Sequence, residues 1–256
     1  ISGLLDKRAL IVTRPFRSPH HTTSHIGLIG GGTTPHPGEI SLAHRGVLFL
    51  DEFPEFPRHV LEALRQPVED GVVTISRSRG RVNFPAKFML IAAQNPCPCG
   101  YFGNPVRNCK CSLNQIIRYQ RRVSGPMLDR IDIHLDVPAV KVEKLTQQSN
   151  PEPVEGSSAI RKRVQKARDL QTKRFKNKKI TSNSEMGNKE IKEFCELDEN
   201  CIKLLQLAVV KMNLSARSYN RTIKLARTIA DLEGLNNISS THIAESLQYR
   251  PRNDTL

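Results

Sequence analysis

The chain has 256 residues, of which 38% are hydrophobic, and a formal net charge of +14. No apolar run approaches the roughly 18 residues needed to cross a bilayer, and the mixed first ten residues do not resemble a secretory signal. These features argue against a membrane-spanning or exported protein, and we expect the cytoplasm. The positive charge favours a polyanionic partner, although a merely basic, solvated surface explains it equally well.

Up to residue 138 the sequence predicts an α/β core with a parallel sheet. Short apolar runs bounded by polar residues are typical of strands in a parallel sheet, and apolar residues at helical spacing predict helices. In chain order, the predicted elements are a strand buried on both faces at Val47–Leu50, a helix at 59–68, a β-hairpin at 72–76 and 81–84, a second buried strand at 88–93, and a strand with one polar face at 131–137.

Beyond residue 138 the sequence predicts only helices. Residues 139–156 are rich in polar residues and contain two prolines, so we expect a linker there. The predicted all-α domain covers 157–256, with helical patterns at 157–179, 201–211, 217–232 and 241–249. The first of these carries ten Lys or Arg against one acid, which suits either a phosphate-binding face or a solvated helix.

The first chemical signal is the pair Asp51-Glu52 directly after the apolar run Val47–Leu50. In phosphate-transferring ATPases a buried strand delivers two adjacent carboxylates where ligands of parallel sheets bind. The first acid holds magnesium, usually through its waters, and the second polarises the attacking water. Solvated acids after an ordinary strand would give the same local pattern.

Three further polar residues follow the acidic pair in an order that strengthens this interpretation. Asn95 follows the next predicted strand and could orient water, or it could simply start a turn before Pro96. Arg130 could reach a neighbouring subunit's nucleotide, or pair with a nearby aspartate. Arg217 lies in the first turn of a helix capped by Ser215, where an arginine opposes the helix dipole and an anionic partner would compensate.

These segments resemble the magnesium-chelatase-like AAA+ ATPases of the YifB/ComM type. The resemblance is carried by Leu-Phe-Leu-Asp-Glu-Phe-Pro-Glu-Phe from residue 48, Ala-Gln-Asn-Pro-Cys-Pro-Cys-Gly from residue 93, and Ser-Ala-Arg-Ser-Tyr-Asn-Arg from residue 215. It implies a AAA+ core with a helical lid, a hexameric ring, and the cofactors ATP and magnesium. It also implies that Asp51 and Glu52 are Walker B, Asn95 sensor 1, Arg130 the arginine finger and Arg217 sensor 2.

One element of that family is missing from the sequence. The chain contains no Gly-x-x-x-x-Gly-Lys-Ser/Thr loop, and the glycine-rich stretch 27–38 has no lysine. Because this loop binds the phosphates, we expect the chain alone to bind ATP poorly and to hydrolyse it negligibly. We therefore expect a carboxyl-terminal fragment whose missing loop lies upstream of Ile1.

Four of the six cysteines are clustered, which favours a metal over disulfides in a chain with no secretory signal. Cys97 and Cys99 form one Cys-x-Cys pair, and Cys109 and Cys111 form another. Four soft ligands suit a closed, structural zinc site, although reduced and partly buried thiols remain an alternative. Two further cysteines, Cys195 and Cys201, lie on helical patterns and are expected to be buried small hydrophobes.

The first segment contains five histidines between residues 20 and 44 that match no metal-binding spacing, so we expect a polar loop. The predicted hairpin carries Arg77, Arg79 and Arg81 at its tip, where a ring of such tips could bind a DNA backbone without reading sequence. A solvated hairpin end is the alternative.

Three functions are consistent with these features. The first is part of an ATP-driven, ring-forming DNA translocase or helicase acting in branch migration, natural transformation or recombination. The second is a magnesium-chelatase-type motor subunit that acts on a protein partner. The third is a non-catalytic, zinc-containing DNA-binding module.

Overall fold

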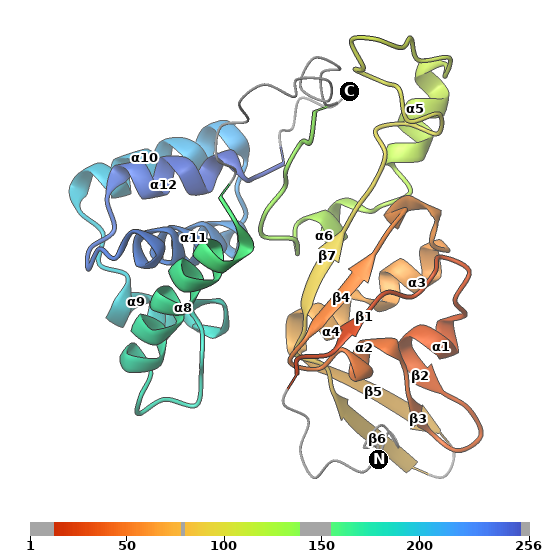
Figure 1. Ribbon diagram of the computed structural model, residues 1–256, viewed down its shortest axis with the longest axis horizontal. Helices are drawn as coiled ribbons and strands as arrows, with labels where there is room; N and C mark the ends of the chain where they lie inside the picture. Colours follow the sequence, from red (N-terminus) through yellow and green to blue (C-terminus); the bar gives the residue numbers. More distant parts are fainter. Residues whose placement is uncertain (1–12, 78–79, 139–154, 252–256) are drawn as a thin grey trace. The chain divides into compact units, whose positions relative to one another are not determined.

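The computed structural model describes residues 13–77, 80–138 and 155–251, and the chain divides into two compact units between Ile131 and Asp132 (Figure 1). The first unit combines helices with a parallel sheet, and the described part of the second contains only helices. The predicted fold class, an α/β core followed by an all-α part, is confirmed. Of the predicted linker at 139–156, residues 139–154 lie outside the described residues.

A three-stranded parallel sheet forms the centre of the first unit, with the strand order β1-β4-β7. Strand β4 (Val47–Leu50) lies between β1 (Phe16–Arg17) and β7 (Met89–Ala92), and its last residue is level with Ala92. Gly46 permits the close approach of β1, because a Cβ there would lie 1.9 Å from the carbonyl oxygen of Pro15. The predicted strand at Val47–Leu50 is therefore confirmed, and its two neighbours run in the same direction.

The other elements of the first unit are short. Helices α3 and α4 occupy the predicted helical region, and β5 pairs with β6 as the predicted antiparallel hairpin. The elements are α1 (His25–Ile29), β2 (Gly30–Gly31), β3 (His36–Pro37), α2 (Glu39–Leu42), the 3-10 helix η1 (Phe53–Glu55), α3 (Arg58–Ala63), α4 (Arg65–Asp70), β5 (Val72–Arg77), β6 (Gly80–Pro85), α5 (Leu113–Gln120) and α6 (Gly125–Leu128).

The core of the first unit lies against one face of the sheet. Leu48 and Leu50 of β4 are fully buried and pack with Phe53, Val60 and other apolar residues of the surrounding helices. On the strand β7, by contrast, Met89 and Ile91 are 61% and 42% exposed. The prediction that this strand is buried is therefore wrong, since the described helices and loops cover only one side of it. The prediction that β4 is buried on both faces is also wrong, because Val47 and Phe49 are only half-buried.

The predicted strand at 131–137 is not present. Residues 131–138 have no regular secondary structure, and Leu135 and Val137 are 68% and 90% exposed. The segment follows the helical unit instead: the Asp132 carboxylate accepts from Arg221 at 2.7 Å, and the His134 backbone N–H donates to the Tyr249 carbonyl at 2.8 Å. Alternation of polar and apolar residues predicts a strand only where a neighbouring strand is available for pairing.

The histidine-containing segment is also more ordered than the predicted loop. Ser24 caps α1 by accepting from the Gly27 backbone N–H at 3.1 Å, and Leu28 is fully buried in the core. Two-residue strands β2 and β3 then pair antiparallel. The short helix α1 forms although Gly27 disfavours it, because the Ser24 cap and the burial of Leu28 compensate.

The second unit consists of helices around its own apolar core, and the four predicted helical regions are confirmed. Ile191, Leu205, Ala226 and Ile243 are among the core residues. Among the described residues, no helix is both long and apolar enough to span a membrane. The elements are α8 (Ser157–Arg174), η2 (Asn183–Glu185), α9 (Asn188–Phe194), α10 (Glu199–Met212), α11 (Ala216–Glu233) and α12 (Ser240–Gln248).

A buried ionic network joins the helices of this second unit. The Asp231 carboxylate has a fully buried side chain and accepts four hydrogen bonds, at 2.5 and 2.7 Å from Arg174, 2.8 Å from Asn183 and 3.1 Å from Arg227. The buried Arg227 also donates to the carbonyls of Asn236 and Leu235, each at 2.5 Å. Every oxygen of this buried carboxylate is therefore paired, as burial of a charge requires.

Candidate functional site

The acidic pair lies at the carboxyl edge of the parallel sheet. Asp51 and Glu52 directly follow β4 and are both exposed, and Asn95 follows the neighbouring strand β7 and is also exposed. The backbone pairing continues past the strand ends, because Phe53 N–H donates to the Ala93 carbonyl at 2.9 Å. The structure thus brings the three predicted polar residues to one edge, as expected for the ends of adjacent parallel strands.

Glu52 has an unusual backbone conformation. Its φ and ψ are 51° and 44°, in the left-handed region that residues other than glycine rarely occupy. The turn is supported by the Glu52 N–H, which donates to the Asp51 carboxylate at 2.9 Å, and by the 3-10 helix η1 that begins at the next residue. Strain of this kind is found preferentially at functional sites.

One of the five histidines of the predicted polar loop, His21, lies against Glu52. The Nδ1 atom of His21 is 2.9 Å from the Glu52 carboxylate, and the ring of His20 lies 4.1 Å from that of His21. One ligand atom from each of the three side chains lies within 4.8 Å of the others, so this group could also hold a metal ion. No linear signal predicted the contact, because the histidines and the glutamate come from separate segments of the chain.

Arg130 and Arg217 lie in different units. The guanidinium of Arg130 is 15% exposed and is bound within the first unit, to Glu69 at 2.6 Å and to the Pro126 carbonyl at 2.7 Å. Arg217 is exposed in the first turn of α11, where the predicted cap is confirmed: Ser215 Oγ accepts from the Ser218 N–H at 3.2 Å. Arg130 thus forms an ion pair with Glu69, an acid that the sequence did not predict as its partner.

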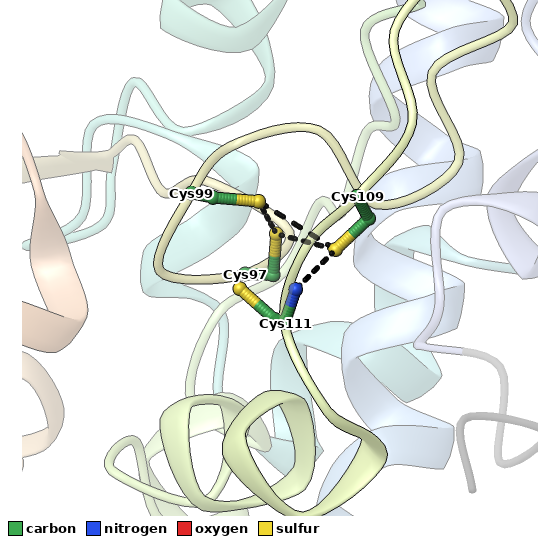
Figure 2. A group of neighbouring side chains, drawn as sticks. All are labelled: Cys97, Cys99, Cys109 and Cys111. Atoms are coloured by element: carbon green, nitrogen blue, oxygen red, sulfur yellow. Dashed lines mark hydrogen bonds between the residues drawn. The ribbon is translucent and has the colours of Figure 1, made fainter.

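The four clustered cysteines converge on one point (Figure 2). The Sγ atoms of Cys97, Cys99 and Cys109 are 3.4–3.6 Å apart, and all four Sγ atoms lie within 4.8 Å of one another. Tetrahedral zinc with Zn–S bonds of about 2.3 Å requires sulfur atoms about 3.8 Å apart. All four cysteines are free thiols, so the donor set and its spacing fit a zinc ion better than a pair of disulfides.

The loop that carries these cysteines favours the thiolate form of at least one of them. Hydrogen bonds from the backbone N–H groups of Tyr101 and Lys110 lower the pKa of the Cys99 thiol to about 6. A thiolate is the form that binds a metal. Helix α5 begins directly after the cluster, with a capping box formed by Ser112 and Gln115.

The two remaining cysteines are structural. Cys195 and Cys201 are buried in the core of the helical unit, and burial is the largest of the effects that raise the pKa of each thiol to about 11. Such thiols stay protonated at neutral pH and behave as small hydrophobes, as predicted.

The predicted DNA-binding arginines are only partly described. Ser76 is level with Arg81 in the β5–β6 hairpin, and Arg77 is level with Gly80, whose φ of 139° requires glycine. Arg81 is exposed, whereas Arg79 lies outside the described residues. The predicted hairpin is therefore present, with Arg77 and Arg81 on its paired strands.

Comparison with known proteins matches both parts of this chain to magnesium-chelatase families. The family described as "Magnesium chelatase, subunit ChlI" matches residues 1–145, and "Magnesium chelatase, subunit ChlI C-terminal" matches residues 154–250. "Competence protein ComM" of Haemophilus influenzae is 47% identical over 237 residues, which are 93% of this chain and 45% of that protein.

Two other relatives extend the comparison. YifB of Escherichia coli is 44% identical over 238 residues, again 93% of this chain and 45% of the relative. "Magnesium-chelatase subunit ChlI, chloroplastic" of Glycine max is 22% identical over 228 residues, 86% of this chain and 47% of the relative. The chain thus spans slightly less than half the length of the relatives it matches.

Proposed function

The chain belongs to the magnesium-chelatase-like family of the YifB/ComM type, and on that premise we propose that it carries part of the ATP-hydrolysis site of a ring-forming DNA translocase. The observation that carries this proposal is the placement of Asp51, Glu52 and Asn95 at one edge of a parallel sheet. A carboxylate pair beside an amide at that edge can bind a hydrated cation and orient a water molecule.

Each polar residue has a separate task in this proposal. Asp51 holds magnesium through its waters, which suits a cation that prefers oxygen ligands and keeps several waters. When bound, magnesium neutralises phosphate oxygens during transfer. Glu52 accepts a hydrogen bond from the attacking water, and Asn95 fixes the position of that water against the terminal phosphate.

The two arginines stabilise the charge that develops on the phosphate. Arg130 acts on the nucleotide of a neighbouring subunit, for which it must exchange Glu69 for a phosphate oxygen, and Arg217 acts from the helical unit. Arginines in such positions contribute about 10³-fold or more to rate in other phosphoryl-transfer systems. The phosphates themselves must be bound by a Gly-Lys-Ser/Thr loop, which these 256 residues do not contain.

The proposed substrate on which the motor moves is DNA, bound without sequence preference. The charge of +14 and the arginines of the β5–β6 hairpin support this choice. The relative named for competence is 47% identical to this chain, whereas the chelatase subunit is 22% identical. This difference supports a role in natural transformation or recombination rather than a role as a chelatase motor. We further propose that the four-cysteine cluster binds one structural zinc ion, because it leaves no coordination position open.

The test is ATP hydrolysis by a protein that joins this chain to a Gly-Lys-Ser/Thr loop. We expect hydrolysis stimulated by DNA and reduced at least 100-fold by Glu52→Gln, with nucleotide binding retained. The matched control is Asp70→Asn, which neutralises an exposed acid at the end of α4, outside the proposed site. Undiminished hydrolysis by Glu52→Gln would contradict the assignment. If the joined protein binds DNA but does not hydrolyse ATP at all, the non-catalytic DNA-binding module is favoured instead.

A further inference from the structure

A strongly basic cleft lies between α5 and residues 54–58, the segment that follows the acidic pair and leads into α3. It encloses about 770 Å³ and is lined by four arginines, Arg58, Arg118, Arg121 and Arg122, and by a single acid, Glu55. No feature of the sequence singled out these arginines, because Arg58 comes from a segment distant from the others. The fold brings them together by placing α5 opposite the turn that follows β4.

The only acid of the cleft is already neutralised. Arg122 donates to the Glu55 carboxylate at 2.5 Å and to the Pro54 carbonyl at 3.4 Å, which ties α5 to η1. No hydrogen bond or ion pair within the described residues engages the side chains of Arg58, Arg118 and Arg121, and all three are exposed. Three positive charges therefore face one open cleft with no counter-charge from this part of the chain.

The arginines stand on a firm support. Helix α5 buries Ile116 and Tyr119 on its opposite face, starts from the capping box of Ser112, and directs Arg118 and Arg121 into the cleft. The guanidinium group matches phosphate geometry and remains charged at any physiological pH. Arg118 and Arg121 are three residues apart on α5, so their side chains lie on the same face of the helix.

We propose that this cleft binds the phosphodiester backbone of a nucleic-acid strand. The inference rests on the proposed action on DNA and adds a second contact to that of the hairpin. The aromatic residue that lines the cleft, Phe56, is 3% exposed and offers no platform for base stacking. The cleft therefore contacts the backbone alone and does not discriminate between base sequences.

The test is the salt dependence of binding of this chain to a fluorescein-labelled 20-nucleotide oligo-dT, measured by anisotropy. Each phosphate neutralised on a single strand contributes about 0.7 to the slope of log K against log salt. The triple variant Arg58→Gln/Arg118→Gln/Arg121→Gln should therefore lower the slope by about 2 and the affinity at 0.1 M salt by about 100-fold. The exposed positions predict an unchanged thermal unfolding curve.

The control removes the same charge elsewhere. Lys192→Gln/Lys203→Gln/Lys211→Gln changes three exposed lysines of the helical unit and should leave the slope within about 0.5 of the unmodified chain. A cleft variant that binds like this control would overturn the inference.

A second measurement locates the site directly. Phenylglyoxal modifies accessible arginines, and bound oligo-dT should protect Arg58, Arg118 and Arg121, as mapped by peptide mass spectrometry. Unchanged modification of all three under saturating oligonucleotide would contradict the proposal. A hairpin variant, Arg77→Gln/Arg79→Gln/Arg81→Gln, separates the two ideas: loss of binding there with a normal cleft variant rejects the cleft and retains the DNA-binding function.

Discussion

The acids at the end of β4 and the aspartate of α11 carry the same chemical group but have opposite surroundings. Asp51 and Glu52 are exposed at a sheet edge, and Glu52 holds a strained backbone conformation. Asp231 is fully buried and accepts four hydrogen bonds from two arginines and an asparagine. A buried carboxylate whose oxygens all accept hydrogen bonds from the protein contributes to the stability of the fold. An exposed carboxylate at the end of a strand can instead bind a ligand.

The largest expected effect comes from breaking the buried network. Asp231→Asn keeps the shape of the side chain but leaves Arg174 and Arg227 without their negative partner, which should cost about 3–5 kcal/mol of unfolding free energy. Denaturant unfolding followed by circular dichroism measures this loss. The control is Asp169→Asn, an exposed acid of α8, which should change stability by less than about 0.5 kcal/mol.

Acid should weaken the same network, to a smaller extent than the substitution. Burial raises the pKa of Asp231, but the hydrogen bonds from Arg174 and Asn183 and the charges of the arginines outweigh it, so the pKa lies below the usual 3.8. A carboxyl group whose folded pKa is depressed contributes stability above its unfolded pKa and loses it as pH falls through the folded pKa.

The helical unit should therefore lose stability below about pH 4. The loss attributable to this group is the difference between the unmodified chain and Asp231→Asn over a titration from pH 6 to pH 2.5. Parallel curves for the two proteins would show that Asp231 is not the group responsible.

The cysteine cluster offers an intermediate case, because its donors are satisfied only when a metal is bound. We expect about one zinc per chain after purification without chelators, and a stabilisation of about 2.7 kcal/mol at free zinc 100-fold above its dissociation constant. Elemental analysis and thermal unfolding with and without EDTA test this. Cys97→Ser should abolish both effects, and Cys195→Ala, in the other core, should retain the zinc.

The sequence predicted those parts of the molecule that depend on neighbouring residues. Strand β4, the β5–β6 hairpin and the four helical regions of the second unit follow from short-range periodicity, and the cysteine spacing predicted a cluster. The pattern at 131–137 failed because alternation cannot show whether a pairing partner is within reach. The exposure of β7 could not be predicted either, since it depends on which face other elements cover.

Contacts between distant segments were equally beyond reach. Neither the approach of His21 to Glu52 nor the meeting of Arg58 with the arginines of α5 has a local signature, because each depends on how loops return to the sheet. The roles assigned to Asn95, Arg130 and Arg217 remain predictions.

The smallest effect concerns the strained glutamate and sharpens the comparison with Asp231 most directly. Glu52→Gly should be more stable than Glu52→Ala by about 1 kcal/mol, because both remove the carboxylate and only glycine relieves the left-handed conformation. Equal stabilities would show that the turn carries no strain. If Glu52→Gly has a higher free energy of unfolding than the unmodified chain, then holding a carboxylate in this conformation lowers the stability of the chain. Every substitution of Asp231, by contrast, should lower the free energy of unfolding. Stability changes of opposite sign at Glu52 and Asp231 would distinguish a carboxylate of the functional site from a structural carboxylate by measurement rather than by burial alone.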